Sequence, residues 1–201
     1  NGSCEVCTVA VVAGSNIDCQ RCPKRTVRRV ANLDEARWND LKRTEKRRFF
    51  ECLDDLRHSL QFGYGTFTRE QLHSIDNSHR LYQEQTPPVW DIAARAFAYT
   101  EILMELITED ERAVFFPDQF ASTKQQQQLE TLIEERLPRV SATTSSSKQR
   151  RGIQTADCVA GGIREQQMGN EPWLDYLSEP VAASDQNYWA LTALEHHLNE
   201  M

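Results

Sequence analysis

Long hydrophobic runs are missing from this chain of 201 residues. Its longest apolar stretches, at 8–13 and 113–117, fall far short of the roughly 20 residues that a membrane helix needs. A basic region followed by an apolar run and a small-residue cleavage site is also missing from the start, so no secretion signal is visible. We therefore expect no membrane partner and a cytoplasmic protein.

Motifs of several enzyme classes are absent as well. The eight glycines form no phosphate-binding loop, no serine lies in a Gly-x-Ser-x-Gly elbow, and no histidine belongs to a His-Glu-x-x-His pair. Acidic residues outnumber basic ones by 30 to 23, which gives a net charge of −7. This charge disfavours an indiscriminate nucleic-acid coat but allows a local basic surface.

Short apolar segments alternate with amphipathic ones along the chain, and this alternation is typical of an α/β domain. Strands are expected at 8–14, 60–68, 112–117 and 140–143. Helices are expected from 32 or 34 to 41, and at 44–60, 69–76, 89–107, 122–137, 152–167 and 184–197. We predict one domain over 1–201, with a mixed sheet flanked by helices and a helical C-terminal part.

Two aspartates occupy positions that a solvated surface explains poorly. Asp118 directly follows an expected strand, at the edge where α/β sheets carry their sites. Asp157 lies on an expected helix beside an apolar stripe, where a carboxylate needs a cation, a metal or several donors. The stripe consists of Ile153, Ala156, Ala160 and Ile163. A structural interpretation stays open, because Asp118 could cap a helix and Asp157 could pair with Arg150 or Arg151.

The stretch 152–162 (GIQTADCVAGG) resembles a motif of the uncharacterised DUF-three-thousand-eight-hundred family, whose members are ribonuclease H-like. Asp118 and the stretch 35–38 (EARW) match further motifs of that family in the expected order. The resemblance implies a ribonuclease H-like fold in which Glu35, Asp118 and Asp157 bind Mg²⁺ or Mn²⁺. By itself Glu35 is a weak candidate, since an acid in the first turn of a helix is favoured by the dipole alone.

One departure from the family concerns the first strand. The family ends that strand with aspartate, glutamate, serine and glycine, and this chain opens at Asn1 about where that motif should finish. We expect either that a first strand was removed or that this copy lacks its first ligand and is inactive.

Basic residues are concentrated near the N-terminus, with eleven of the 23 within the 28 positions 21–48. Such segregation predicts a phosphate-facing surface that includes Arg28 and Arg29, with Lys124 and Gln154 as further phosphate or supporting contacts. An equally favoured interpretation is that these arginines pair with acids on the same helices.

Four cysteines, at positions 4, 7, 19 and 22, form two Cys-x-x-Cys pairs within a Cys-rich segment at 1–30. The spacing of Cys4, Cys7, Cys19 and Cys22 matches a zinc ribbon. If 8–14 is one straight strand, however, the pairs lie too far apart to share an ion. Free thiols are the favoured interpretation, and Cys52 and Cys158 are expected to be small core residues.

The resulting prediction is a metal-dependent nuclease that cleaves nucleic acid. Two divalent ions held by carboxylates can stabilise both the attacking water and the leaving oxygen of a phosphodiester. The alternative is an inactive ribonuclease H-like binding or adaptor module, with or without a structural zinc site. The sequence does not predict the oligomeric state or distinguish DNA from RNA as substrate.

Overall fold

The structure is a computed structural model that describes residues 6–14, 21–26, 35–68, 88–119 and 122–177. The strands in these ranges are β1 (Val6–Gly14), β2 (Leu60–Thr68), β3 (Ala113–Phe115) and β4 (Val140–Ala142). The α-helices are α1 (Arg21–Thr26), α2 (Arg43–Asp55), α5 (Pro88–Leu106), α6 (Thr123–Arg136) and α7 (Arg151–Gln167). Two 3-10 helices are η2 (Trp38–Asp40) and η3 (Trp173–Tyr176). The helices expected at 69–76 and 184–197 lie outside the described residues.

Strands β1 and β2 form an antiparallel pair that runs from Val6 opposite Thr68 to Gly14 opposite Leu60. A glycine in β2 sets the distance to helix α5. A Cβ atom added at Gly63 would lie 2.7 Å from the Cγ2 atom of Ile102, so only glycine lets the helix approach this strand so closely.

Strands β3 and β4 pair in parallel, and a further bridge joins Asp118 to Ser145 beyond their ends. Helix α6 connects these strands, and its first turn is closed by a capping box between Ser122 and Gln125. Within the described part of the chain the strands therefore make two separate two-stranded sheets. The single mixed sheet expected from the sequence is not formed there, although the mixed α/β class is confirmed.

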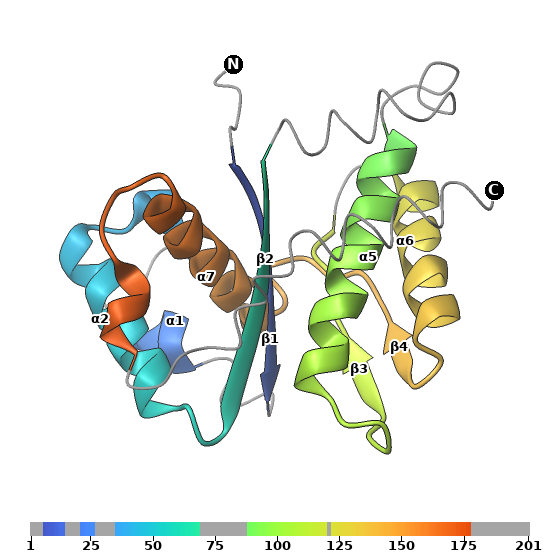
Figure 1. Cartoon of the computed structure of the whole chain (residues 1–201), viewed down its shortest axis with the longest axis horizontal. Helices are drawn as coiled ribbons and strands as arrows, with labels where there is room; N and C mark the ends of the chain where they lie inside the picture. Colours follow the sequence, from blue (N-terminus) through green and yellow to red (C-terminus); the bar gives the residue numbers. More distant parts are fainter. Residues whose placement is uncertain (1–5, 15–20, 27–34, 69–87, 120–121, 178–201) are drawn as a thin grey trace.

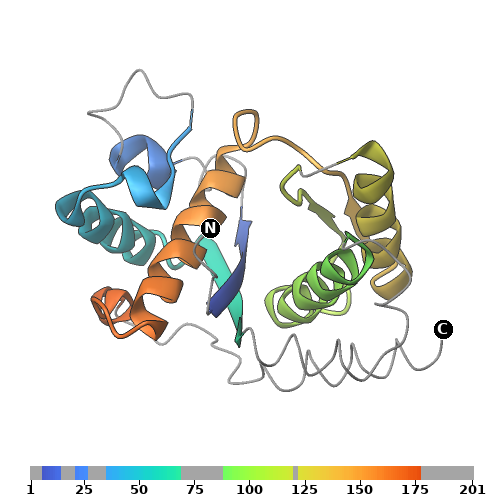
Figure 2. The ribbon, with the colours of Figure 1, turned by 90° about the horizontal axis from the view of Figure 1, so that it is seen from above.

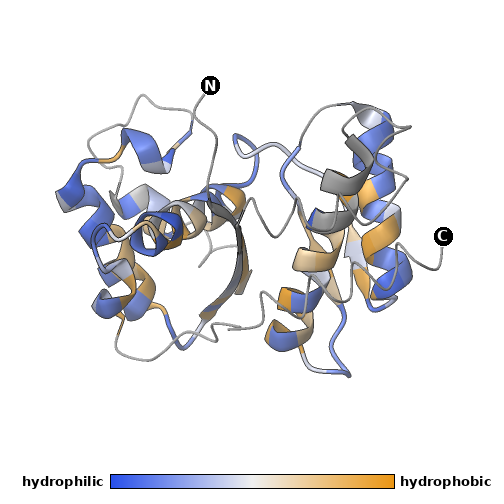
Figure 3. Cartoon of the chain, turned by 45° about the horizontal axis from the view of Figure 1, so that its top comes forward, coloured by the Kyte–Doolittle hydropathy of each residue, from blue (hydrophilic) through white to orange (hydrophobic). Residues whose placement is uncertain are grey.

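The β1–β2 pair lies between two layers of helices (Figures 1 and 2). Helices α2 and α7 with η3 cover one side, and their core contains Phe49, Phe50, Ile163 and Trp173. Helices α5 and α6 lie on the other side, with a second core that includes Val11 of β1. Figure 3 shows hydrophilic and hydrophobic residues alternating along the turns of α6, as an amphipathic helix requires.

Three local predictions are wrong. The helix expected to end at Leu41 is only the short η2, and the helix expected through Leu60 ends at Asp55 because Leu60 already pairs in β2. The apolar stripe expected on α7 is rotated around the helix axis. Its buried residues are Gln154, Thr155, Cys158, Val159, Gly161, Gly162 and Ile163.

No helix in the described residues is long and apolar enough to cross a membrane. The longest one, α5, has 19 residues and packs against β1, β2 and α6. It therefore belongs to the core of the domain.

Candidate functional site

The three predicted acidic residues come from three separate parts of the fold. Glu35 precedes η2, Asp118 follows β3, and Asp157 lies on the second turn of α7. Each negative charge acts on another: Glu35 raises the pKa of both aspartates, and Asp157 raises that of Asp118. The structure thus places three carboxylates that are far apart in the sequence within range of one another's charge.

Glu35 is held by two neighbours. Its Oε1 atom accepts a hydrogen bond from the hydroxyl of Ser147, and its Oε2 atom accepts bonds of 2.9 and 3.2 Å from Arg37. These interactions, with the charge of Lys148, keep the pKa of Glu35 below its ordinary value, the bond from Ser147 having the largest effect. Glu35 is therefore a carboxylate whose charge is stabilised before any ligand arrives.

Gln154 joins the segment that carries Glu35 to the loop that carries Ser147. Its Oε1 atom accepts a bond of 3.2 Å from the backbone N–H of Ala36, and its Nε2 atom donates one of 2.8 Å to the carbonyl of Ser147. The side chain is buried, at 4% exposure. Of the two roles that the sequence suggested for Gln154, these contacts favour the supporting one over a phosphate contact.

The anionic forms of Asp118 and Asp157 are disfavoured, because their pKa values are raised whereas that of Glu35 is lowered. Both side chains reach the surface, yet the surrounding protein removes part of their hydration, and this desolvation is the largest cause of their raised pKa values. Backbone N–H groups of Gln119 and Ser147 oppose the shift at Asp118, and that of Trp38 opposes it at Asp157. A cation placed among the three carboxylates would relieve their repulsion.

Three basic residues surround this acidic cluster of Glu35, Asp118 and Asp157. Arg37 interacts with Glu35 and also with Asp157, Lys148 acts on Glu35, and Arg164 acts on Asp157. Arg150, one of the partners expected for Asp157, has its guanidinium 4.0 Å from the centre of the Phe116 ring. The site therefore combines carboxylates with cations that a phosphate could contact.

The chemistry of the donor set suits a hard divalent cation, because Mg²⁺ and Mn²⁺ prefer carboxylate oxygens. In the described ranges, however, no three histidine, cysteine, aspartate or glutamate side chains converge closely enough to hold a metal ion. Arg37 supplies part of the neutralising charge instead. Binding of a cation at the acidic cluster would require the carboxylates to approach one another further.

The remaining predicted site residues lie elsewhere or outside the described ranges. Lys124 is exposed in the first turn of α6. Arg28, Arg29, Cys4 and Cys19 are outside the described residues, as is the side chain of Cys7. Cys22 is buried against Cys52, so its thiol faces a partner that the zinc-ribbon spacing does not include. The zinc site stays a prediction.

Sequence reasoning did not assign roles to Ser147, Arg37, Lys148 or Arg164. A signal was available for two of them, since Ser147 and Lys148 immediately precede the helix that carries Asp157. Their orientation toward Glu35 depends on a contact between residues 112 positions apart. Local sequence could not reveal it.

No protein-family model, curated protein or solved structure matches this chain. The fold and the site therefore define a class by chemistry alone. It is a mixed α/β protein in which three carboxylates lie near arginine and lysine side chains. The resemblance to the DUF-three-thousand-eight-hundred family stays a prediction based on three short motifs.

Proposed function

We propose that this protein cleaves phosphodiester bonds of nucleic acid with the help of a divalent cation at the acidic cluster. The observation that carries the proposal is the mutual electrostatic influence of Glu35, Asp118 and Asp157, the three acids that the family resemblance implies as ligands. A ribonuclease H-like arrangement is part of the proposal, supported by acids that come from a later strand and a late helix. A bound divalent cation supplies charge that stabilises the transition state of phosphodiester cleavage.

The residues of the chain have distinct tasks in this proposal. Glu35, Asp118 and Asp157 hold the cation, and Ser147 orients Glu35 through the hydroxyl hydrogen bond. Arg37 exchanges its contact with Glu35 for a phosphate oxygen of the substrate, which its planar guanidinium matches in geometry. Lys148 adds a second positive charge that acts on Glu35.

The proposal is tested by incubating the full-length gene product with labelled single- and double-stranded DNA and RNA in Mg²⁺, Mn²⁺ or a chelator. We expect cleavage that depends on the cation and that is lost in Asp118→Asn. The matched control is Asp110→Asn, which changes an exposed aspartate in the turn before β3 and should cleave like the parent. Cleavage that persists in the chelator, or in Asp118→Asn, would contradict the proposal.

A second candidate is a binding module without catalysis. It is favoured by one observation, that Arg37 and Ser147 hydrogen-bond both carboxylate oxygens of Glu35. This candidate predicts that the protein binds the same oligonucleotides with or without a divalent cation and leaves them intact.

Replacing Gln154 by leucine should weaken Mn²⁺ binding by about 10- to 100-fold, as expected for a group that orients a metal ligand. The substitution removes the two bonds that join the Ala36 and Ser147 backbones. With Ser147 displaced, the pKa of Glu35 should rise toward its ordinary value. Calorimetric titration with Mn²⁺ measures the first effect, and carboxyl carbon NMR measures the second.

Gln166 offers a matched control on the same helix. Its Oε1 atom accepts a bond of 2.8 Å from the backbone N–H of Leu174, so Gln166→Leu also removes a glutamine-to-backbone bond of α7. We expect this variant to lose stability, by about 1 kcal/mol for one hydrogen bond, but to keep the Mn²⁺ affinity of the parent. Equal loss of affinity in both variants would show that Gln154 has only a structural role.

A further inference from the structure

Two buried cysteines from different helices lie in contact. Cys22 of α1 is fully buried and Cys52 of α2 is 5% exposed, and both belong to the core formed by α2, α7 and η3. The Cys22 thiol donates a hydrogen bond to the sulfur of Cys52. Helix α1 packs directly against α2, so the two cysteines lie at the contact between these helices.

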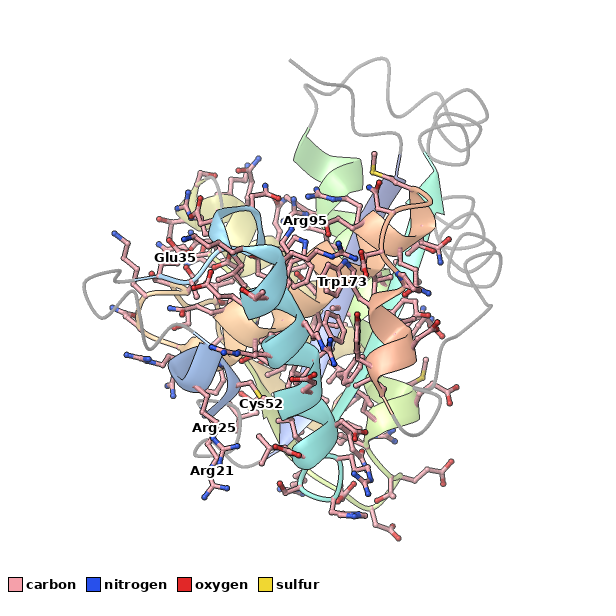
Figure 4. The ribbon with its side chains drawn as sticks, turned by 90° about the vertical axis from the view of Figure 1, so that its left-hand side faces the viewer. Arg21, Arg25, Glu35, Cys52, Arg95 and Trp173 are labelled. Carbon is pink, nitrogen blue, oxygen red and sulfur yellow. The ribbon has the colours of Figure 1, made fainter. Side chains whose placement is uncertain are left out.

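A charged residue distinguishes this pair from an ordinary contact between core thiols. Arg25 lies one turn after Cys22 on α1, and Figure 4 labels it near Cys52 of the adjacent helix α2. Its guanidinium acts on the sulfur of Cys52 and lies 3.7 Å from the carboxylate of Asp55. Its side chain is 57% exposed, so the guanidinium links the buried sulfur to the surface. The charge of Arg25 acts on both sulfurs, but its hydrogen bond goes to Cys52 alone, so the two cysteines are not equivalent.

The acid–base properties agree with this geometry. The hydrogen bond from Cys22 is the largest cause that lowers the pKa of Cys52, with Arg25 contributing, and together they bring it to about 7 despite desolvation. The same hydrogen bond and burial raise the pKa of Cys22 well above its ordinary value. The thiolate, the form that reacts with oxidants, is thus favoured on Cys52 over Cys22.

We propose that Cys22 and Cys52 form a redox pair that a hydroperoxide converts into a disulfide, with Cys52 as the attacking sulfur and Cys22 as the resolving one. The Cys52 thiolate attacks one peroxide oxygen, the O–O bond breaks, and the departing hydroxide takes up a proton to become water. The Cys22 sulfur then attacks the Cys52 sulfenic acid, the S–S bond forms, and a second water leaves with the Cys22 proton. Two thiols are oxidised and one hydroperoxide is reduced.

Burial restricts the oxidant to a small one. A hydroperoxide such as hydrogen peroxide has a size close to that of water, whereas a low-molecular-weight disulfide would need α1 to detach before reaching either sulfur. The product links α1 to α2 and closes the chain segment that contains Glu35 and Trp38. This inference is independent of the proposed nuclease function, since it uses neither the acidic cluster nor a metal.

The experiment treats the full-length protein, with Cys4, Cys7 and Cys19 changed to serine, with hydrogen peroxide and maps the cysteines by peptide mass spectrometry. We expect a Cys22–Cys52 crosslink that thiol reductants reverse, formed at a rate that rises with pH through about 7, the pKa of Cys52. In Cys22→Ser, dimedone should trap a sulfenic acid on Cys52, and in Cys52→Ser it should trap none on Cys22.

Cys158→Ser is the matched control, because Cys158 is buried in the same core and burial raises its pKa. This variant should form the crosslink at the rate of the parent. Circular dichroism establishes that each variant is folded, and Cys22→Ala replaces Cys22→Ser if the serine variant is not. Reduced thiols after peroxide treatment, a crosslink through Cys158, or sulfenic acid on Cys22 in place of Cys52 would each overturn the proposal.

Discussion

Replacing Asp157 by asparagine should abolish cation-dependent cleavage while leaving the cation-free fold at least as stable as that of the parent. Asparagine keeps the shape of the side chain but removes the charge that a divalent ion requires. Groups that only orient a metal ligand cost 10- to 100-fold, so losing a ligand should lower the cleavage rate by about 100-fold or more. Mn²⁺ affinity should fall in parallel.

The expected effect on stability follows from the raised pKa of Asp157, caused first by desolvation and then by the charge of Glu35. A carboxyl group whose pKa is higher in the folded than in the unfolded protein stabilises the fold at acid pH, and this contribution is lost as the pH rises through the folded value. Asparagine does not titrate, so the stability of Asp157→Asn has no such pH-dependent contribution. The melting temperature of the variant relative to the parent should therefore increase from acid to neutral pH without metal.

Asp175→Asn is the matched control, since it changes an exposed aspartate of η3 in the same way. It should leave cleavage, Mn²⁺ affinity and the pH dependence of melting unchanged. If Asp157→Asn instead melts well below the parent at neutral pH without metal, Asp157 is a structural anion paired with Arg37 or Arg164. The metal-ligand assignment would then be wrong.

The strands and most helices were predictable because each carries its own periodic pattern. All four expected strands are present, and α6 begins at the Ser122 cap as predicted. The prediction of a helix up to Leu41 was wrong because tertiary contacts outweigh the local pattern there. Trp38 is buried in the core, at 2% exposure, and the Ala36 backbone N–H donates a hydrogen bond to Gln154. These tertiary contacts hold residues 36–37 in a non-helical conformation up to the short η2.

The orientation of α7 was not predictable from hydrophobicity. A periodicity argument treats glycine as neutral, but Gly161 and Gly162 form the closest contacts of this helix with Trp38 and Phe50. The buried face of α7 therefore contains the two glycines and Cys158. Ala156 and Ala160, which were expected to be buried, are only half-buried. The need for glycine at positions 161 and 162 becomes clear only from the positions of Trp38 and Phe50 in the folded protein.

The candidate site was predictable in its acids and not in their surroundings. Asp118 and Asp157 each carried a local signal, the end of a strand and small neighbours, whereas Glu35 was singled out only by the family resemblance. The serine and glutamine contacts at the segment that carries Glu35 join residues more than 100 positions apart. A motif shows which residues bear charge, whereas the assembly of the site depends on packing between α7 and η2.

Replacing Gly161 by alanine should destabilise the fold by about 3 kcal/mol, the upper end of the range for overpacking a core. A Cβ atom at this position would lie 2.4 Å from Cγ and 2.6 Å from Cβ of Trp38. The indole cannot move aside, because its ring meets those of Phe49, Phe50 and Trp173 edge-on, with centroids 6.4, 5.9 and 5.4 Å away. Urea unfolding should show a lower midpoint with an unchanged slope.

The same substitution should also weaken Mn²⁺ binding, since it displaces Trp38, whose backbone N–H hydrogen-bonds Asp157. The reverse change at the neighbouring half-buried Ala160 calibrates the intrinsic cost of glycine in this helix, about 1 kcal/mol. Helix propensity alone predicts that Gly161→Ala gains that amount. A variant that is more stable than the parent would therefore show that α7 does not pack against Trp38 as described, and the positioning of Asp157 by η2 would be wrong with it.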